Sequence, residues 1–258
     1  MDDTNEIARK AVGLREELLR TVRESAPDTW AQMIRHGARF TMPEAWSVLD
    51  PTDQAARLAE TELRRVIDGP LYALGHGACR AVIDASCAGL LLAPDILPAP
   101  SGSVYFHTPI ALPGPDRVGS VMIATWGPPP PAMGLPGLWL TWYADPRESG
   151  EAARIGLPPT TGVRIDQEHF LRFFPAIDQR LMPGTAPAEE TSRILRTVLL
   201  TLLGIRQELL PGRTIQPASA AESGDRSAPP VRVVEIADPA IPRRLAEAAG
   251  AHAMKLLA

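Results

Sequence analysis

Apolar positions recur at helical spacing through the first part of the chain. They return every three or four residues, at Ile7, Ala11, Leu14, Leu18 and Val22. This spacing places them on one face and predicts an amphipathic helix over residues 4–25. Aspartates that can cap a helix predict two further helices, over residues 28–40 and 50–68. Residues 1–69 are therefore expected to form an N-terminal helical region.

The hydrophobic pattern changes at residue 70. Only six of the residues from 70 to 145 are charged, and a segment so poor in charge is expected in the core. Residues 71–92 are almost continuously apolar and predict a buried helix. Three shorter runs, over residues 103–112, 118–126 and 138–144, are rich in β-branched and aromatic side chains. Each is bounded by Pro, Gly or Asp, which predicts strands of an antiparallel meander.

The last part of the chain mixes helical and extended patterns. Residues 164–174 predict the end of a strand followed by a short helix. Residues 185–210 are apolar on most of a helical circumference, so we expect a helix that packs on the sheet. A strand over residues 231–236 and a helix over 241–257 follow. Between them and the long helix, residues 216–230 are rich in Ser, Ala, Pro and Gly and predict an exposed linker.

Together these elements predict an α+β fold. Its centre is a short-stranded antiparallel or mixed sheet, preceded by helices and packed by the long apolar helix. We expect two parts, the helical region of residues 1–69 and an α+β core of residues 70–258.

Proline and arginine stand out in the composition. Proline supplies 27 and glycine 20 of the 258 residues, and neither fits easily inside a helix or strand, so loops must be frequent. All basic residues except Lys10 and Lys255 are arginine, which is typical of a GC-rich genome. The net charge of −4 argues against a protein whose whole surface binds nucleic acid or an anionic membrane.

Hydropathy and cysteine content bear on the compartment. No apolar run reaches the roughly 20 residues that span a bilayer, so we expect a cytoplasmic protein without membrane contact. Cys79 and Cys87 are about 12 Å apart if they lie on one helix, too far for a disulfide, and are predicted to be buried free thiols. No Cys-x-x-Cys pair occurs, so we expect no structural zinc, and no cofactor is predicted.

The densest group of titratable side chains is Asp166, Glu168 and His169. Joined in space by His107, these residues could bind a divalent metal ion or act as a general acid–base pair. That arrangement would be typical of a metal-dependent nuclease or phosphoesterase. A polar surface turn has the same composition, and the spacing matches no established metal motif.

Two other groups could form binding surfaces. Four arginines, Arg164, Arg172, Arg193 and Arg196, could contact phosphates if they face one side, as in a nucleic-acid-binding accessory protein; otherwise they form a solvated face. Trp126 and Trp139 flank a proline-rich connection that contains Pro129. Exposed, they would mark a protein-binding surface; buried, they would be ordinary core residues.

Two segments carry a resemblance to known sequences. Residues 91–112, with Leu-Pro-x-Pro-x-Gly before a β run that ends in proline, and residues 230–234 resemble blocks found in actinobacterial and actinophage proteins of unknown activity. The resemblance implies an actinobacterial host or mobile element, and no particular reaction. Our sequence-based hypothesis is a non-enzymatic cytoplasmic subunit that binds a protein partner or itself, as in a bacterial defence or mobile-element assembly.

Overall fold

The computed structural model describes residues 3–35, 49–85, 94–111, 120–130, 137–145, 164–172, 189–216, 229–235 and 238–257. The helices in these ranges are α1 (Asp3–Glu24), α2 (Ala26–Arg35), α4 (Pro51–Asp68), α5 (His76–Asp84), the 3-10 turn η1 (Pro94–Ile96), α7 (Glu189–Arg206) and α8 (Ile241–Leu257). The strands are β1 (Leu71–Leu74), β2 (Gly102–Ala111), β3 (Ser120–Gly127), β4 (Gly137–Asp145), β5 (Arg164–Arg172), β6 (Gly212–Ile215) and β7 (Val231–Val234).

The described strands form one seven-stranded sheet in the order β5-β4-β3-β2-β1-β7-β6. From β2 to β5 each strand pairs antiparallel with the next, as the predicted meander requires. The short strand β1 pairs in parallel with β2 on one side and with β7 on the other, and β6 adds an antiparallel edge to β7. The sheet is therefore mixed, and the predicted α+β class is confirmed.

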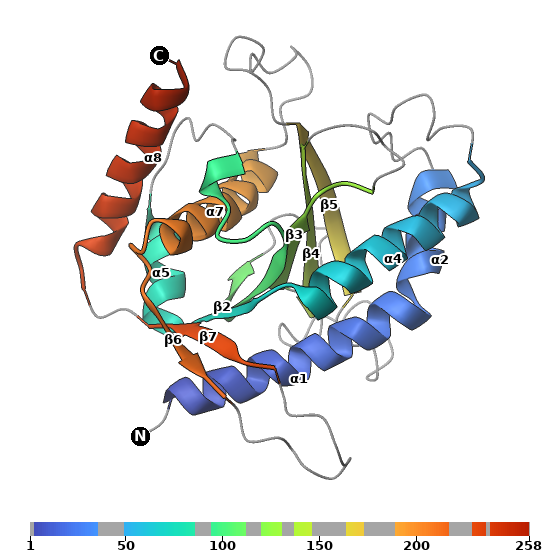
Figure 1. Ribbon diagram of the computed structural model, residues 1–258, viewed down its shortest axis with the longest axis horizontal. Helices are drawn as coiled ribbons and strands as arrows, with labels where there is room; N and C mark the ends of the chain where they lie inside the picture. The colour runs from blue at the N-terminus through green and yellow to red at the C-terminus, as the bar shows by residue number, and fades with distance from the viewer. Residues whose placement is uncertain are drawn as a thin grey trace.

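Helices cover both faces of the sheet (Figure 1). One buried cluster joins side chains of α5, η1, α7 and α8 to one face, including Leu74, Phe106 and Trp142. A second joins α1, α2 and α4 to the other face, including Ala73, Tyr105 and Tyr143. In β1, β2, β4 and β7, neighbouring buried residues serve the two clusters in turn, because successive side chains of a strand point to opposite faces.

The helices predicted over residues 4–25, 50–68 and 241–257 are confirmed. The helix α2 begins at Ala26, so Asp28 lies within its first turn and does not cap it, and residues 36–40 of that prediction lie outside the described residues. The helices α1, α4 and α8 begin and end within about two residues of the predicted limits. Asp50 caps α4, because its carboxylate accepts a hydrogen bond from the Thr52 amide at 2.7 Å. No described helix is both long and apolar enough to cross a membrane.

Two local predictions are wrong. Residues 71–92 do not begin as a helix: Leu71–Leu74 is the strand β1, and α5 starts only after Gly75. Each residue of β1 is buried, because helices cover both faces of this central strand, and a strand of that kind shows no polar alternation. The segment predicted as a strand end plus helix is one strand, β5, paired with β4 along its length. Residues 217–228 of the predicted linker lie outside the described residues.

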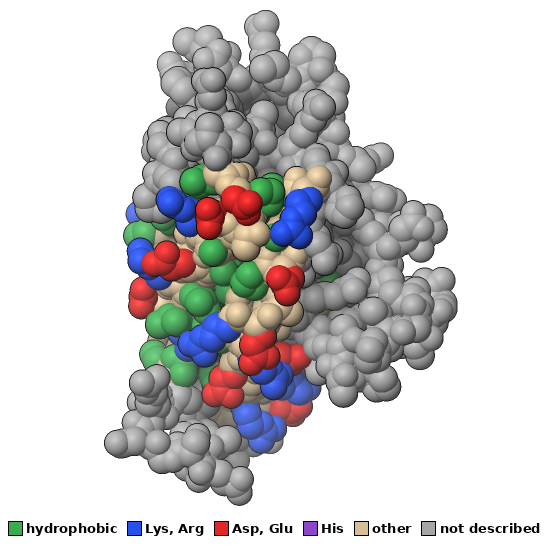
Figure 2. All heavy atoms as spheres, turned by 90° about the vertical axis from the view of Figure 1, so that its right-hand side faces the viewer, with side chains coloured by type: hydrophobic (Ala, Val, Ile, Leu, Met, Phe, Trp, Pro, Cys, Tyr) green, Lys and Arg blue, Asp and Glu red, His purple; other side chains and the backbone are tan. Residues whose placement is uncertain are grey.

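The surface over α2 and α4 carries both signs of charge. Figure 2 shows acidic, basic and apolar side chains interspersed over the described part of this face. One example is the ion pair between Glu60 and Arg64 on α4, in which both side chains are more than half exposed. The described part of this face therefore has no uniform charge that would attract a strongly charged polymer.

Candidate functional site

The strand order separates the residues of the predicted acid–base cluster. Asp166, Glu168 and His169 lie on β5, whereas His107 lies on β2, with β3 and β4 between them. Adjacent strands are about 4.8 Å apart, so β2 and β5 are about 14 Å apart. This separation argues against His107 as a member of the cluster, and a site formed by Asp166, Glu168 and His169 alone stays a prediction. The side chains of β5 lie outside the described part of the chain.

The four candidate arginines come from two elements. Arg164 and Arg172 are the first and last residues of β5, about 26 Å apart at about 3.3 Å per residue. Arg193 and Arg196 lie on α7, and Arg196, the one of the four whose side chain is described, is half-buried. A surface that combines all four arginines stays a prediction.

The tryptophans and the proline of the predicted docking surface are buried. Trp126 is 0% and Trp139 1% exposed, and the two indoles pack into opposite faces of the sheet. Trp126 also donates a hydrogen bond from Nε1 to the Ala99 carbonyl at 3.1 Å. Pro129 is buried as well. These three residues are part of the core. They do not form the exposed protein-binding surface that the sequence-based hypothesis required.

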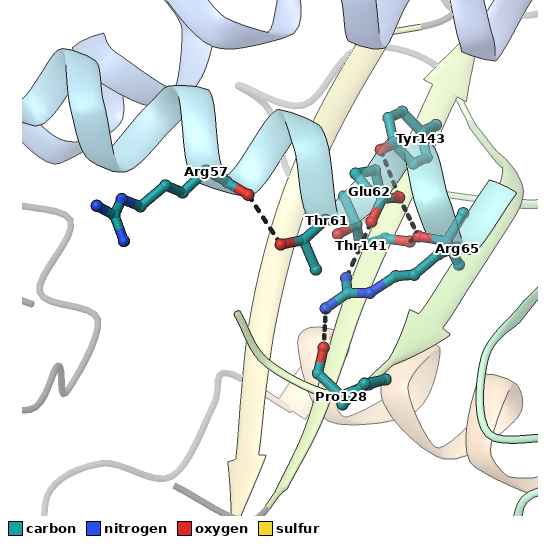
Figure 3. A network of polar contacts seen from close by, with 8 residues as sticks. Arg57, Thr61, Glu62, Arg65, Pro128, Thr141 and Tyr143 are labelled. Atoms are coloured by element: carbon teal, nitrogen blue, oxygen red, sulfur yellow. Dashed lines mark hydrogen bonds and ion pairs between the residues drawn. The ribbon is translucent and has the colours of Figure 1, made fainter. Parts of the chain in front are cut away.

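A buried ion pair lies between α4 and the sheet (Figure 3). Glu62 and Arg65 are only 1% and 4% exposed, and Arg65 Nη1 is 2.9 Å from Glu62 Oε2. Glu62 Oε1 accepts hydrogen bonds from the hydroxyl of Tyr143, at 2.7 Å, and from that of Thr125. Arg65 Nη2 donates to the carbonyl of Pro128. The pair therefore ties α4 to β3, to β4 and to the start of the proline-rich connection.

The surroundings of this ion pair show why it is tolerated in the core. A buried carboxylate is costly unless donors satisfy it, and Glu62 has three. Gly127 makes room for Arg65, since a Cβ at that position would stand 2.7 Å from Arg65 Nε. We did not identify the pair from sequence. The sequence pattern does indicate it, because Glu62 and Arg65 are charged residues on the buried face of α4, together with Leu58 and Val66.

Polar groups from several elements gather at the carboxyl end of the parallel strands. β1 ends at Leu74, level with Phe106 of β2 and Val234 of β7. Beyond this level, β1 leads into α5, β2 continues as far as Ala111, and β7 is followed by Glu235. In open sheets with parallel strands, ligands bind outside the carboxyl ends where connections leave in different directions. This edge is therefore the candidate site that the topology favours.

A histidine and a threonine form the centre of this edge. His76, the first residue of α5, is exposed, and its Nδ1 lies 2.7 Å from Thr108 Oγ1 on β2. Among the described residues the imidazole of His76 has no other hydrogen-bond partner. Nearby on β2, His107 Nδ1 lies 3.5 Å from the Tyr105 hydroxyl. The contact with Thr108 thus engages one nitrogen of His76 and leaves Nε2 for another molecule.

The remaining polar groups at the edge come from β7 and α1. Glu235 directly follows β7, and its Oε2 accepts a hydrogen bond from the Thr4 hydroxyl at 2.9 Å. Glu6 forms an ion pair with Lys10 at 3.0 Å. That contact with Lys10 lowers the pKa of the Glu6 carboxyl. Glu6 is therefore ionised at neutral pH.

A cysteine lies beneath this edge and is structural. Cys79 on α5 is buried, and its thiol donates a hydrogen bond to the Leu74 carbonyl at 3.3 Å. Burial raises the pKa of the Cys79 thiol to about 11, so the reactive thiolate is scarce at neutral pH. The predicted buried free thiol is confirmed for Cys79, whereas Cys87 lies outside the described residues.

Metal binding finds no support in the described residues, where no three His, Cys, Asp or Glu side chains are arranged to hold an ion. Comparison of the chain with protein-family models, with curated proteins and with solved structures finds no match.

Proposed function

We propose that this protein binds a small polar molecule at the carboxyl end of β1 and β7, beside the second half of β2, with His76 as its principal contact. The observation that carries the proposal is the contact of 2.7 Å between the exposed His76 imidazole and the Thr108 hydroxyl. These residues come from different elements and meet where the topology favours a ligand.

The chemistry of the edge supports hydrogen bonding to a ligand. The contact with Thr108 fixes the orientation of the His76 ring. Its Nε2 can then donate or accept a hydrogen bond, according to the tautomer. The first amides of α5 have no partner within the helix and add donors beside His76. A ligand with hydroxyl, carbonyl or similar polar groups fits these contacts.

A binding screen tests this proposal. The full chain is examined by thermal shift and then by calorimetry against a panel of nucleotides, sugars, amino acids and organic acids. We expect at least one compound to bind the parent protein and to lose about tenfold or more in affinity to His76→Asn and to Thr108→Val, since each change leaves a polar group unpaired. Thr61→Val is the control, because Thr61 donates only to the Arg57 carbonyl on α4. Equal affinity for all variants would refute the proposal.

We also propose, as a second candidate, the protein-interaction role in the cytoplasm that the sequence predicted. The observation that favours it is the hydrogen bond from buried Arg65 to the Pro128 carbonyl. Pro128 is exposed, and Arg65 holds the first residue of the proline-rich connection in place. Exposed proline-containing segments are typical ligands of aromatic grooves, and Pro128 is the described proline of this connection that is exposed. A pull-down with the parent protein and with Arg65→Met tests this role. A partner that binds both equally would exclude the anchored connection as its docking site.

A further inference from the structure

The strand β6 forms one border of the described sheet, next to β7 (Figure 1). It pairs antiparallel with β7, and in the part of the chain that the structure describes its backbone has no other hydrogen-bond partner. In a strand with one neighbour, about half of the amides and carbonyls point away from that neighbour. Arg213 and Thr214 of β6 are exposed. The outer side of β6 therefore offers the hydrogen-bonding groups on which another extended chain can add to the sheet.

Two arginines lie at this border, one on each face of the sheet. The register sets Arg213 opposite Val233, which packs with α1, so Arg213 lies on the α1 face. Arg232 of β7 directly precedes Val233 and therefore lies on the other face. Its side chain lies over Gly212, because a Cβ at Gly212 would stand 2.6 Å from Arg232 Cγ and 2.8 Å from Arg232 Nε. Glycine at this position thus lets Arg232 extend from β7 across β6.

The two arginines make this border positively charged. Among the described residues, neither Arg213 nor Arg232 has an ion-pair or hydrogen-bond partner. No acidic residue occurs in β6 or β7. The exposed Arg64 of α4, by contrast, is paired with Glu60. A strand edge with unmatched positive charge repels a second copy of itself and attracts an acidic chain.

We propose that β6 is a docking edge for an extended acidic segment of another protein, which adds to the sheet as one more strand. Arg232 brings its charge to Gly212 on one face, and the next residue, Arg213, brings its own to the other face. Successive side chains of the added strand also point to opposite faces, so two consecutive acidic residues fit the two arginines. The inference goes beyond both proposed functions, because this edge involves neither His76 nor Pro128.

Fluorescence anisotropy with labelled peptides tests the chemistry of the partner. The probe has two consecutive glutamates between valines and threonines. One control peptide has lysines in their place, and another separates the glutamates by one residue, so that both point to one face. We expect the probe to bind most tightly, and Arg213→Gln and Arg232→Gln to weaken its binding about threefold each and about tenfold together. Arg64→Gln removes an exposed arginine from α4 and should bind the probe as the parent does.

Hydrogen exchange followed by mass spectrometry locates the bound peptide. The probe at saturation should slow the exchange of the outer amides of β6 about tenfold or more and leave α4 unchanged, because an added strand bonds to those amides. Absence of binding, equal binding of the lysine peptide, or binding that leaves β6 unprotected would overturn the proposal. A dimer of the parent that protects β6 and excludes the probe would assign the edge to a second copy and overturn it as well. The tests at His76 and Pro128 are separate, so the proposed functions stand or fail independently of this edge.

Discussion

The buried ion pair of α4 makes a quantitative prediction about stability. Arg65→Met removes the cation and leaves the Glu62 carboxylate in the core with only the hydroxyls of Tyr143 and Thr125 as donors. A buried charge that loses its partner costs about 3–5 kcal/mol, and Glu62 at 1% exposure has little access to water. We therefore expect Arg65→Met to lower the free energy of unfolding by about 3–5 kcal/mol, measured by urea denaturation.

The double variant Glu62→Leu with Arg65→Met gives the stricter test. Replacing both members of a buried ion pair by apolar side chains is often close to neutral, because no charge then remains in the core. We expect the double variant to be more stable than either single variant, with a coupling of about 2 kcal/mol or more. The control is Arg64→Met, which breaks the exposed pair with Glu60 one residue away and should cost less than about 1 kcal/mol. Additive single effects, or equal costs for Arg65→Met and Arg64→Met, would refute the reasoning.

Two further predictions concern residues near these sites. Gly127→Ala should destabilise the protein by about 1–3 kcal/mol in urea, because the new Cβ would stand 2.7 Å from Arg65 Nε, and the cost should shrink when Arg65 is already Met. Ionisation of the Cys79 thiol is disfavoured in the folded state, where its pKa is about 11 against 9.0 without burial. The free energy of unfolding should therefore fall as the pH rises from about 9 to about 11, by at most about 3 kcal/mol, and Cys79→Ala should flatten this dependence. Identical pH profiles for the two proteins would contradict the assignment of this thiol.

The candidate site could not be predicted from the sequence, because its residues are far apart along the chain. The sequence drew attention to residues that are close along the chain, Asp166, Glu168 and His169, and joined them to His107. In the structure His107 instead lies beside Tyr105 on its own strand, and two strands separate it from β5. The pair of His76 and Thr108 spans 32 positions and could not be recognised, since nothing local links a helix start to the middle of a later strand.

The amino-acid sequence by itself determined the helices and strands whose local residue pattern is typical of that structure. The helices α1, α4 and α8 have an apolar stripe of helical period, and β2, β3 and β4 have β-branched and aromatic residues between breakers, so both follow from neighbours in sequence. Only the tertiary structure decided that β1 is a strand, because its parallel pairing with β2 and β7 depends on segments about 30 and 160 positions away. The same pairing sets Gly75, His107, Thr108 and Glu235 at one edge. The physical reason is that hydrogen bonds between strands and burial on both faces are long-range interactions, which no local pattern of residues specifies.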